Sequence, residues 1–80
     1  MPRLRLFAAA REAAGTGSTT IDGATVAEAL GAARDRFGPA FEDVLATSRI
    51  WVNGSPANDA DALAETDELA VLPPVSGGSI

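Results

Sequence analysis

Residues 69–78 read Leu69-Ala70-Val71-Leu72-Pro73-Pro74-Val75-Ser76-Gly77-Gly78. The apolar run at the start of this segment predicts a strand over residues 68–72, with apolar side chains on both faces and both faces covered. The two prolines that follow end the strand, because proline lacks an N–H group and fixes its φ angle. Residues 73–80 are therefore expected to leave a folded domain, residues 1–72, as an extended tail.

The glycine pair near the end of this tail has a functional interpretation. Gly77 and Gly78 carry no side chains, so their backbone can pass through a narrow channel on another protein. Such a tail suits a chain whose C-terminal region is the substrate of another enzyme. A frayed terminus is the alternative, since two glycines near a C-terminus are a weak signal by themselves. Their position after a strand and two prolines favours the functional interpretation.

Length and charge limit what the chain can be. Eighty residues, 46% of them hydrophobic, make one small globular domain with a modest core, so a partner interface is expected. The net charge of −5 disfavours binding to nucleic acid or acidic membranes. We expect the acidic surface to assist docking onto basic partner surfaces.

The residue types that the chain lacks restrict its chemistry. It contains no Cys and no His, and all six basic residues are arginine. Disulfides, thiolate metal sites, catalytic triads, Schiff bases and P-loops all need one of the missing types. We therefore expect a non-catalytic chain without a bound metal or cofactor, and place any reactive chemistry at the terminal carboxylate. Asp59 and Asp61 are interpreted as a solvated loop rather than a metal site.

Location follows from two further observations. No apolar run is long enough to span a bilayer. Residues 1–5 lack a signal-peptide core, so the cytoplasm is the expected compartment.

Periodicity predicts the remaining elements. Thr25 and Glu28 have the spacing of a capping box at the start of a helix that Gly38 and Pro39 end. Asn53-Gly54 predicts a tight turn, and Pro56 allows only a short edge strand after it. The expected order is a strand at 4–9, a loop at 11–17, a strand at 18–22, a helix at 25–37, a helical turn at 41–45, a strand at 49–52, the edge strand, and a strand at 68–72.

This order predicts an α+β domain with the main helix on one face of a mixed sheet. The apolar stripe of the helix consists of Val26, Leu30, Ala33 and Phe37. Phe7, Trp51 and Leu72 are expected on the opposite face, and an uncovered apolar face normally binds something. Trp51 stays open between packing and interface, and Arg11-Glu12 between surface turn and partner contact.

Three segments together resemble a known family. They are residues 6–15 (Leu-Phe-Ala-Ala-Ala-Arg-Glu-Ala-Ala-Gly), residues 25–30 (Thr-Val-Ala-Glu-Ala-Leu) and residues 67–78, which contain the Pro-Pro-Val-Ser-Gly-Gly tail. Their order and spacing are similar to those of the ubiquitin-like sulfur carriers, whose fold is the β-grasp. Within that family, the small subunit of molybdopterin synthase has the most similar motifs.

The resemblance implies a carrier that other proteins act upon. In this family an activating enzyme uses ATP to adenylate the terminal glycine, and a persulfide donor converts it to a thiocarboxylate. A synthase, in this branch the large subunit of molybdopterin synthase, then receives the sulfur. By resemblance Gly78 bears the sulfur and Gly77 is its flexible neighbour. The positions that resemble partner-facing residues of the family are Phe7, Pro56, Leu72 and Val75.

Ser79 and Ile80 depart from the family pattern, in which the second glycine is usually last. A peptide bond after Gly78 blocks its carboxylate, so we expect a pro-form that a metalloprotease trims. A carrier that has lost its sulfur role is the alternative.

Three functions stay open at this point. The first is sulfur delivery for molybdopterin, and the second is delivery to another pathway, making cysteine, thiamine or a sulfur-containing natural product. The third is modification of other proteins, in which Gly78 is joined to their lysines.

Overall fold

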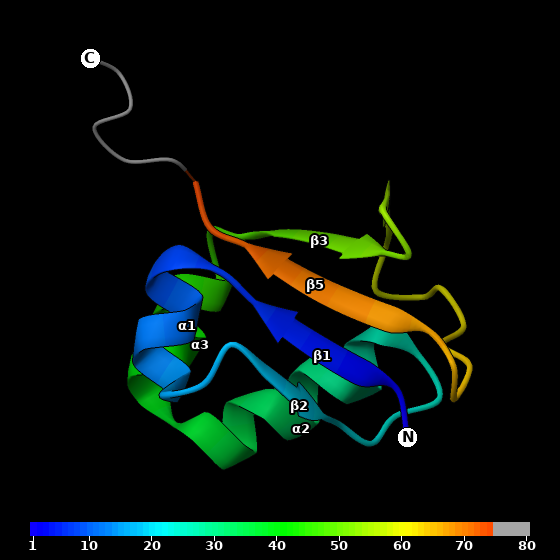
Figure 1. The fold of residues 1–80 in the computed structure, drawn as a ribbon, viewed down its shortest axis with the longest axis horizontal. Coiled ribbons are helices and arrows are strands. Elements are labelled where there is room, and N and C mark those ends of the chain that lie inside the picture. Colours follow the sequence, from blue (N-terminus) through cyan, green and yellow to red (C-terminus); the bar gives the residue numbers. More distant parts are fainter. Residues whose placement is uncertain (75–80) are drawn as a thin grey trace.

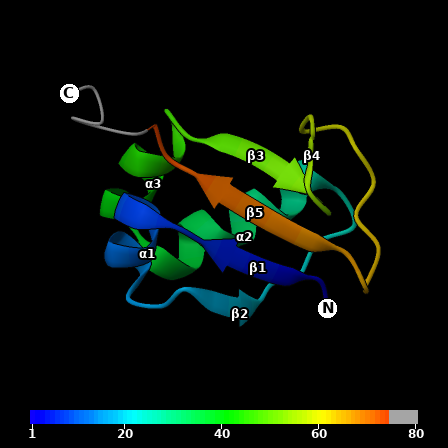
Figure 2. The ribbon, with the colours of Figure 1, turned by 45° about the horizontal axis from the view of Figure 1, so that its top comes forward.

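The computed structural model describes residues 1–74, which form a mixed sheet with helices on one of its faces (Figures 1 and 2). The elements in chain order are β1 (Arg3–Leu6), α1 (Ala8–Ala14), β2 (Ser18–Thr20), α2 (Val26–Phe37), α3 (Pro39–Leu45), β3 (Arg49–Val52), β4 (Ser55–Pro56) and β5 (Glu68–Leu72). This arrangement confirms the α+β class.

The strands lie in the order β2-β1-β5-β3-β4, so the last strand of the chain is the central one. β5 runs parallel to β1, with Leu6 opposite Val71, and antiparallel to β3, with Ile50 opposite Val71. β1 and β2 are antiparallel neighbours, and α1 lies between them in the chain. The central position of β5 explains its apolar sequence, because a strand with neighbours on both edges lies over the middle of the core.

Local sequence explains where α2 begins and ends. The Thr25 hydroxyl accepts a hydrogen bond from the Glu28 N–H at 3.2 Å, as the capping-box spacing predicts. The Glu28 carboxylate accepts from the Ala24 N–H at 2.9 Å, one residue further upstream than in the standard box. Gly38 ends the helix with φ at 91°, and Pro39 begins α3.

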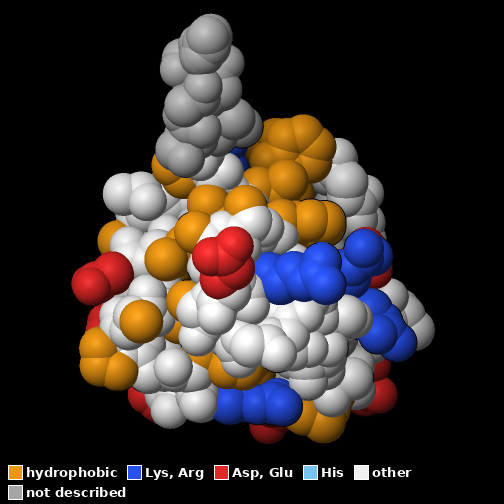
Figure 3. Space-filling view, turned by 60° about the vertical axis from the view of Figure 1, so that its left-hand side comes forward, with side chains coloured by type: hydrophobic (Ala, Val, Ile, Leu, Met, Phe, Trp, Pro, Cys, Tyr) orange, Lys and Arg blue, Asp and Glu red, His pale blue; other side chains and the backbone are white. Residues whose placement is uncertain are grey.

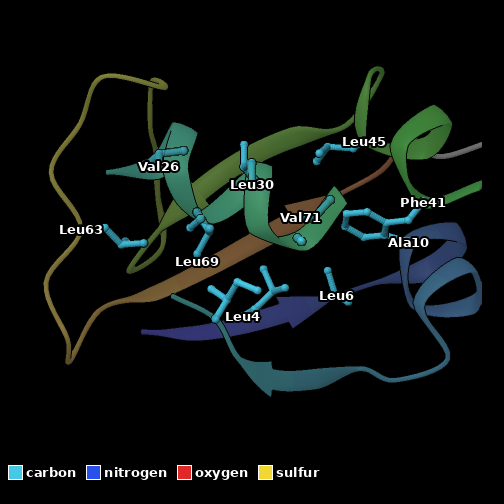
Figure 4. Close-up of a cluster of buried hydrophobic side chains, with 13 residues drawn as sticks. Leu4, Leu6, Ala10, Val26, Leu30, Phe41, Leu45, Leu63, Leu69 and Val71 are labelled. Atoms are coloured by element: carbon cyan, nitrogen blue, oxygen red, sulfur yellow. The ribbon is translucent and has the colours of Figure 1, made fainter. Parts of the chain in front are cut away.

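The core lies between α2 and the inner face of the sheet (Figure 4). The α2 residues Val26, Leu30 and Ala33 are buried, as predicted. The sheet contributes the buried side chains Leu4, Leu6, Leu69 and Val71. Phe37 is only partly buried and packs at a tilt on Phe41, with 5.1 Å between the ring centroids. Phe41 takes the fully buried aromatic position instead.

Helix α1 corrects the prediction of a strand to residue 9 and a loop after it. Strand β1 ends at Leu6, and residues 8–14 form a helix that the structure places against α3. Figure 4 shows Ala10 beside Phe41, and both are fully buried. Gly15 ends the helix in the left-handed region, with φ at 79°. An alanine-rich segment before a glycine is the sequence signal for this helix.

The turn between β3 and β4 also forms hydrogen bonds with the start of β5. Asn53 and Gly54 have φ angles of 51° and 83°, as the Asn-Gly pair predicts for a two-residue hairpin. The side-chain NH₂ group of Asn53 donates to the Asp67 carboxylate at 2.9 Å. The side-chain oxygen of Asn53 accepts from the Glu68 N–H at 2.9 Å. The pKa of Asp67 is lowered because its carboxylate accepts hydrogen bonds. The Ala64 N–H has the larger effect and the Asn53 side-chain amide the smaller one.

Only one face of β5 is covered, contrary to the prediction. Leu69 and Val71 are fully buried on the helix side. Ala70 and Leu72 lie on the other side and are half-buried. Neighbouring side chains of the sheet shield them in part, and the helices all lie on the opposite side (Figure 2). The second apolar face of β5 is thus available to a partner.

Candidate partner-binding face

The side of the sheet away from the helices, called here the outer face, carries a row of residues that crosses all five strands. The register places Arg5 opposite Ser18 on one side and opposite Ala70 on the other. Trp51 lies opposite Ala70 and also opposite Pro56. Directly opposed residues project to the same side of a sheet. The row therefore places Arg5, Trp51 and Pro56 on one surface, although they are far apart in the sequence.

Phe7 and Leu72 extend this surface at the C-terminal ends of β1 and β5. Leu6 lies opposite Val71, and Phe7 and Leu72 are the next residues of these parallel strands. The carbonyl of Phe7 accepts hydrogen bonds from the N–H groups of Ala10 and Arg11 at the start of α1. Its backbone is thereby held while its side chain remains 39% exposed. Figure 3 shows apolar side chains gathered on one part of the surface, with arginine side chains near them.

The outer face lies where the tail begins. Pro73 and Pro74 continue directly from Leu72, the last residue of β5. A partner that covers Phe7 and Leu72 would therefore also lie next to the start of the tail. Val75, Gly77 and Gly78 lie outside the described residues, so their assigned roles stay predictions.

Pro56 and Trp51 both lie on the outer face. Pro56 is exposed on the edge strand β4, which is as short as the proline predicts. Trp51 is half-buried beside it, so part of the indole packs on the sheet and part is open to a partner. The predicted set of Phe7, Pro56 and Leu72 is thus assembled on one side of the sheet.

Arg5 belongs to this surface, and the sequence analysis gave it no role. Its guanidinium carbon lies 5.5 Å from the centre of the Phe7 ring, a distance that permits a cation–π contact. The same group lies 3.4 Å from the Glu68 carboxylate. The signal was the alternation along β1, which already placed Arg5 and Phe7 on one side.

Other residues considered for function lie elsewhere. Arg11 and Glu12 are exposed on α1 rather than in a loop. The Asp61 carboxylate accepts from the Asn58 N–H at 2.8 Å, which is the role of a loop-shaping side chain. Within residues 1–74 no three His, Cys, Asp or Glu side chains gather to form a metal site. The helices in this part of the chain also fall short of the length and apolar character needed to cross a bilayer.

The chain matches the sequence profile of the ThiS family over residues 4–78. It is 33% identical to the molybdopterin synthase sulfur carrier subunit of Arabidopsis thaliana over 79 residues, which cover 95% of this chain and 81% of that protein. It is 36% identical to SAMP1, small archaeal modifier protein 1, of Haloferax volcanii, with a TM-score of 0.85 over 95% of this chain and 97% of that one.

A second solved structure, the BexX/CysO complex of Amycolatopsis orientalis, shows the fold alone, since the matched chain is 20% identical. Its TM-score is 0.82, over 98% of this chain and 100% of that one. The fold and these likenesses define a small ubiquitin-like carrier with the β-grasp architecture. The chain belongs to the ThiS family of ubiquitin-like sulfur carriers.

Proposed function

We propose that this chain carries sulfur as a thiocarboxylate on Gly78. The observation that supports the proposal most strongly is the extent of the family match, which ends at Gly78 and leaves out Ser79 and Ile80. The absence of Cys, His and Lys agrees with it, because a thiocarboxylate carrier needs no nucleophile of its own. Gly77 then serves as the flexible neighbour that lets the tail enter an enzyme channel.

The proposed chemistry takes place on partners. A carboxylate is a poor electrophile, because its oxygen is a poor leaving group. In the adenylating enzyme the Gly78 carboxylate attacks the α-phosphate of ATP, which releases pyrophosphate and forms an acyl-adenylate. The terminal sulfur of a persulfide donor attacks the acyl-adenylate carbon and displaces AMP, which leaves an acyl disulfide. A thiol then cleaves the S–S bond and is itself oxidised to a disulfide, so that Gly78 is left as a thiocarboxylate in which one sulfur has replaced one oxygen. ATP is thus bound by the enzyme, and the carrier holds no cofactor.

The acceptor we propose first is a molybdopterin synthase, since the Arabidopsis relative is a sulfur carrier subunit of that enzyme. Synthases of other sulfur-incorporating pathways are the alternative acceptors. A second candidate function is protein modification, because the likeness to an archaeal modifier protein is equally extensive. These functions share the activated Gly78 and differ in the group that is transferred: sulfur to a small-molecule acceptor in the first, and the Gly78 acyl group to a lysine amine of another protein in the second.

The intact mass of the chain isolated from its own cells tests the proposed function. We expect a chain that ends at Gly78, with a fraction heavier by the sulfur-for-oxygen difference of about 16 Da. A chain that keeps Ser79 and Ile80 and gains no sulfur, in cells that are making molybdopterin, would contradict the proposal. Gly78 joined to lysines of other proteins would support the modifier function instead.

We also propose that the activating enzyme and the synthase contact Phe7, Leu72, Pro56 and Val75. Replacing Phe7 by Ala is expected to weaken binding to either partner by about 1–3 kcal/mol, the usual cost of removing an aromatic anchor. The melting temperature should change little, because the α1 cap bonds of Phe7 use its backbone. Calorimetric titration and thermal melting measure the two effects.

Phe37→Ala is the matched aromatic control. Phe37 packs on Phe41 on the helix side of the molecule. Its loss should lower the melting temperature and leave the affinity of the folded chain unchanged. If Phe7→Ala lowers the melting temperature and keeps full affinity, Phe7 is part of the core and the partner-binding face is wrongly assigned.

A further inference from the structure

The outer face is positively charged on a chain whose net charge is −5. The strand residues that project from it include three arginines and one glutamate, as the register shows: Arg3 lies opposite Glu68, Arg5 opposite Ala70, and Arg49 opposite Leu72. Leu69, Val71 and Ile50 alternate with these residues and contact the core. The outer face itself carries the apolar side chains of Ala70, Leu72 and Trp51, so charged and apolar side chains are interleaved on it.

Two of these arginines form no ion pair within residues 1–74 and are available to a partner. Within residues 1–74, the only ion pair between two side chains joins Arg5 to Glu68. Arg3 donates to the neutral Ser18 hydroxyl at 3.0 Å and is exposed. Arg49 is exposed beside Leu72. Neither Arg3 nor Arg49 therefore has a carboxylate partner in the part of the chain that the structure describes.

Glu68 is the one acidic residue in the described strands. Six exposed acidic residues lie on α2, on α3 and in the loop before β5: Asp35, Glu42, Asp43, Asp59, Asp61 and Glu65. The sequence predicts that an acidic surface docks onto a basic partner, whereas the structure places arginines on the outer face. Arginines lie beside the apolar patch of Phe7 and Leu72. A partner that covers this patch therefore also contacts positive charge.

We propose that the outer face docks onto a protein surface with an apolar centre flanked by Asp and Glu side chains. This inference rests on the proposed function and names the chemistry of the partner. Arginine forms paired hydrogen bonds with carboxylates, and these strengthen when an apolar contact beside them excludes water. Complementary charge of this kind also steers association and fixes orientation. Arg5, held against Phe7 by the cation–π contact, joins the charged and apolar parts of the surface.

A flat sheet that bears arginines and aromatic rings also resembles a platform for single-stranded nucleic acid. The net charge of −5 opposes that occupant, because a negatively charged chain repels the phosphates of a nucleic acid. The experiment therefore includes an RNA arm.

The test measures association of the chain with an adenylating enzyme of the sulfur-carrier class from the same cell, without ATP, by stopped flow at several salt concentrations. The variant Arg3→Glu/Arg49→Glu reverses two charges on the outer face. Arg34→Glu/Arg36→Glu reverses two charges on α2, with the same net change. We expect the first to slow association about 10-fold or more at low salt and the second less than about 2-fold, within the range that steering spans.

Circular dichroism checks that each variant folds, and the milder pair Arg3→Gln/Arg49→Gln serves if the glutamates unfold the chain. Equal effects at the two sites would overturn the inference, as would a salt-independent rate for the unchanged chain. So would binding to a uridine 12-mer that is tighter than binding to the enzyme.

Sulfur transfer to a chain that ends at Gly78, read by mass at saturating enzyme, separates this inference from the proposed function. A chain that gains sulfur although its docking ignores the outer arginines overturns the docking chemistry alone. A chain whose docking depends on Arg3 and Arg49 but that gains no sulfur supports the docking chemistry and contradicts the proposed function.

Discussion

A chain that ends at Gly78 is expected to accept sulfur, and a chain that continues through Ser79 and Ile80 is expected to accept none. Only a free carboxylate can attack ATP, and in the longer form the carboxyl carbon of Gly78 is part of a peptide bond. Adenylation of Ile80 instead would bring a β-branched side chain into a channel suited to glycine, which has no Cβ. The effect is therefore expected to be close to all-or-none.

Both forms would be incubated with the adenylating enzyme, ATP, a persulfide donor and a thiol reductant, and their masses compared. The shorter form should gain about 16 Da, the change when sulfur replaces one oxygen. A form that ends at Gly77 is the matched control, since its carboxylate is free but one residue short of the reacting position. If the Ile80-ended form gains sulfur as readily without losing Ser79 and Ile80, the need for trimming is refuted.

Replacing Leu30 by Ala is expected to lower the free energy of unfolding by about 2–5 kcal/mol, the range for a buried leucine. Leu30 is only 4% exposed at the centre of α2, where its side chain points into the core (Figure 4). A domain of this size has a total stability of about 4–12 kcal/mol, so the loss is a large share. Urea unfolding followed by circular dichroism measures it.

Asp35→Ala is the control on the solvent side of the same helix. Asp35 is exposed, so its loss should change the unfolding free energy by about 0.5 kcal/mol or less. A Leu30→Ala loss below about 1 kcal/mol would contradict the packing of α2 on the sheet, because a cavity left by leucine in a closed core costs more.

Elements with strong local signals were predicted correctly. Thr25 and Glu28 cap α2, Gly38 and Pro39 end it, and Asn53-Gly54 makes the hairpin turn. In each case the stabilising hydrogen bond or φ preference lies within a few residues of the signal, so the sequence contains the whole physical cause.

Helix α1 was missed because its stability depends on a distant contact. Seven residues form too few helical hydrogen bonds to be stable alone. The burial of Ala10 near Phe41 supplies the rest of the stabilisation, and Phe41 lies thirty-one positions later in the sequence. A segment whose conformation is decided by such a contact reads as a turn when only its neighbours are considered.

The candidate site, too, was predicted in part from local sequence and depends in part on distant contacts. Alternation along the strands predicted that Phe7, Trp51 and Leu72 share the face away from the helix, because side-chain direction in a strand is a local property. Strand order and register brought Arg5 between Phe7 and Glu68 and placed Arg49 opposite Leu72. The sequence by itself thus determined which residues point outward. Only the tertiary structure decided which of them meet, because β1 pairs with β5 through residues that are 65 positions apart, such as Arg3 and Glu68.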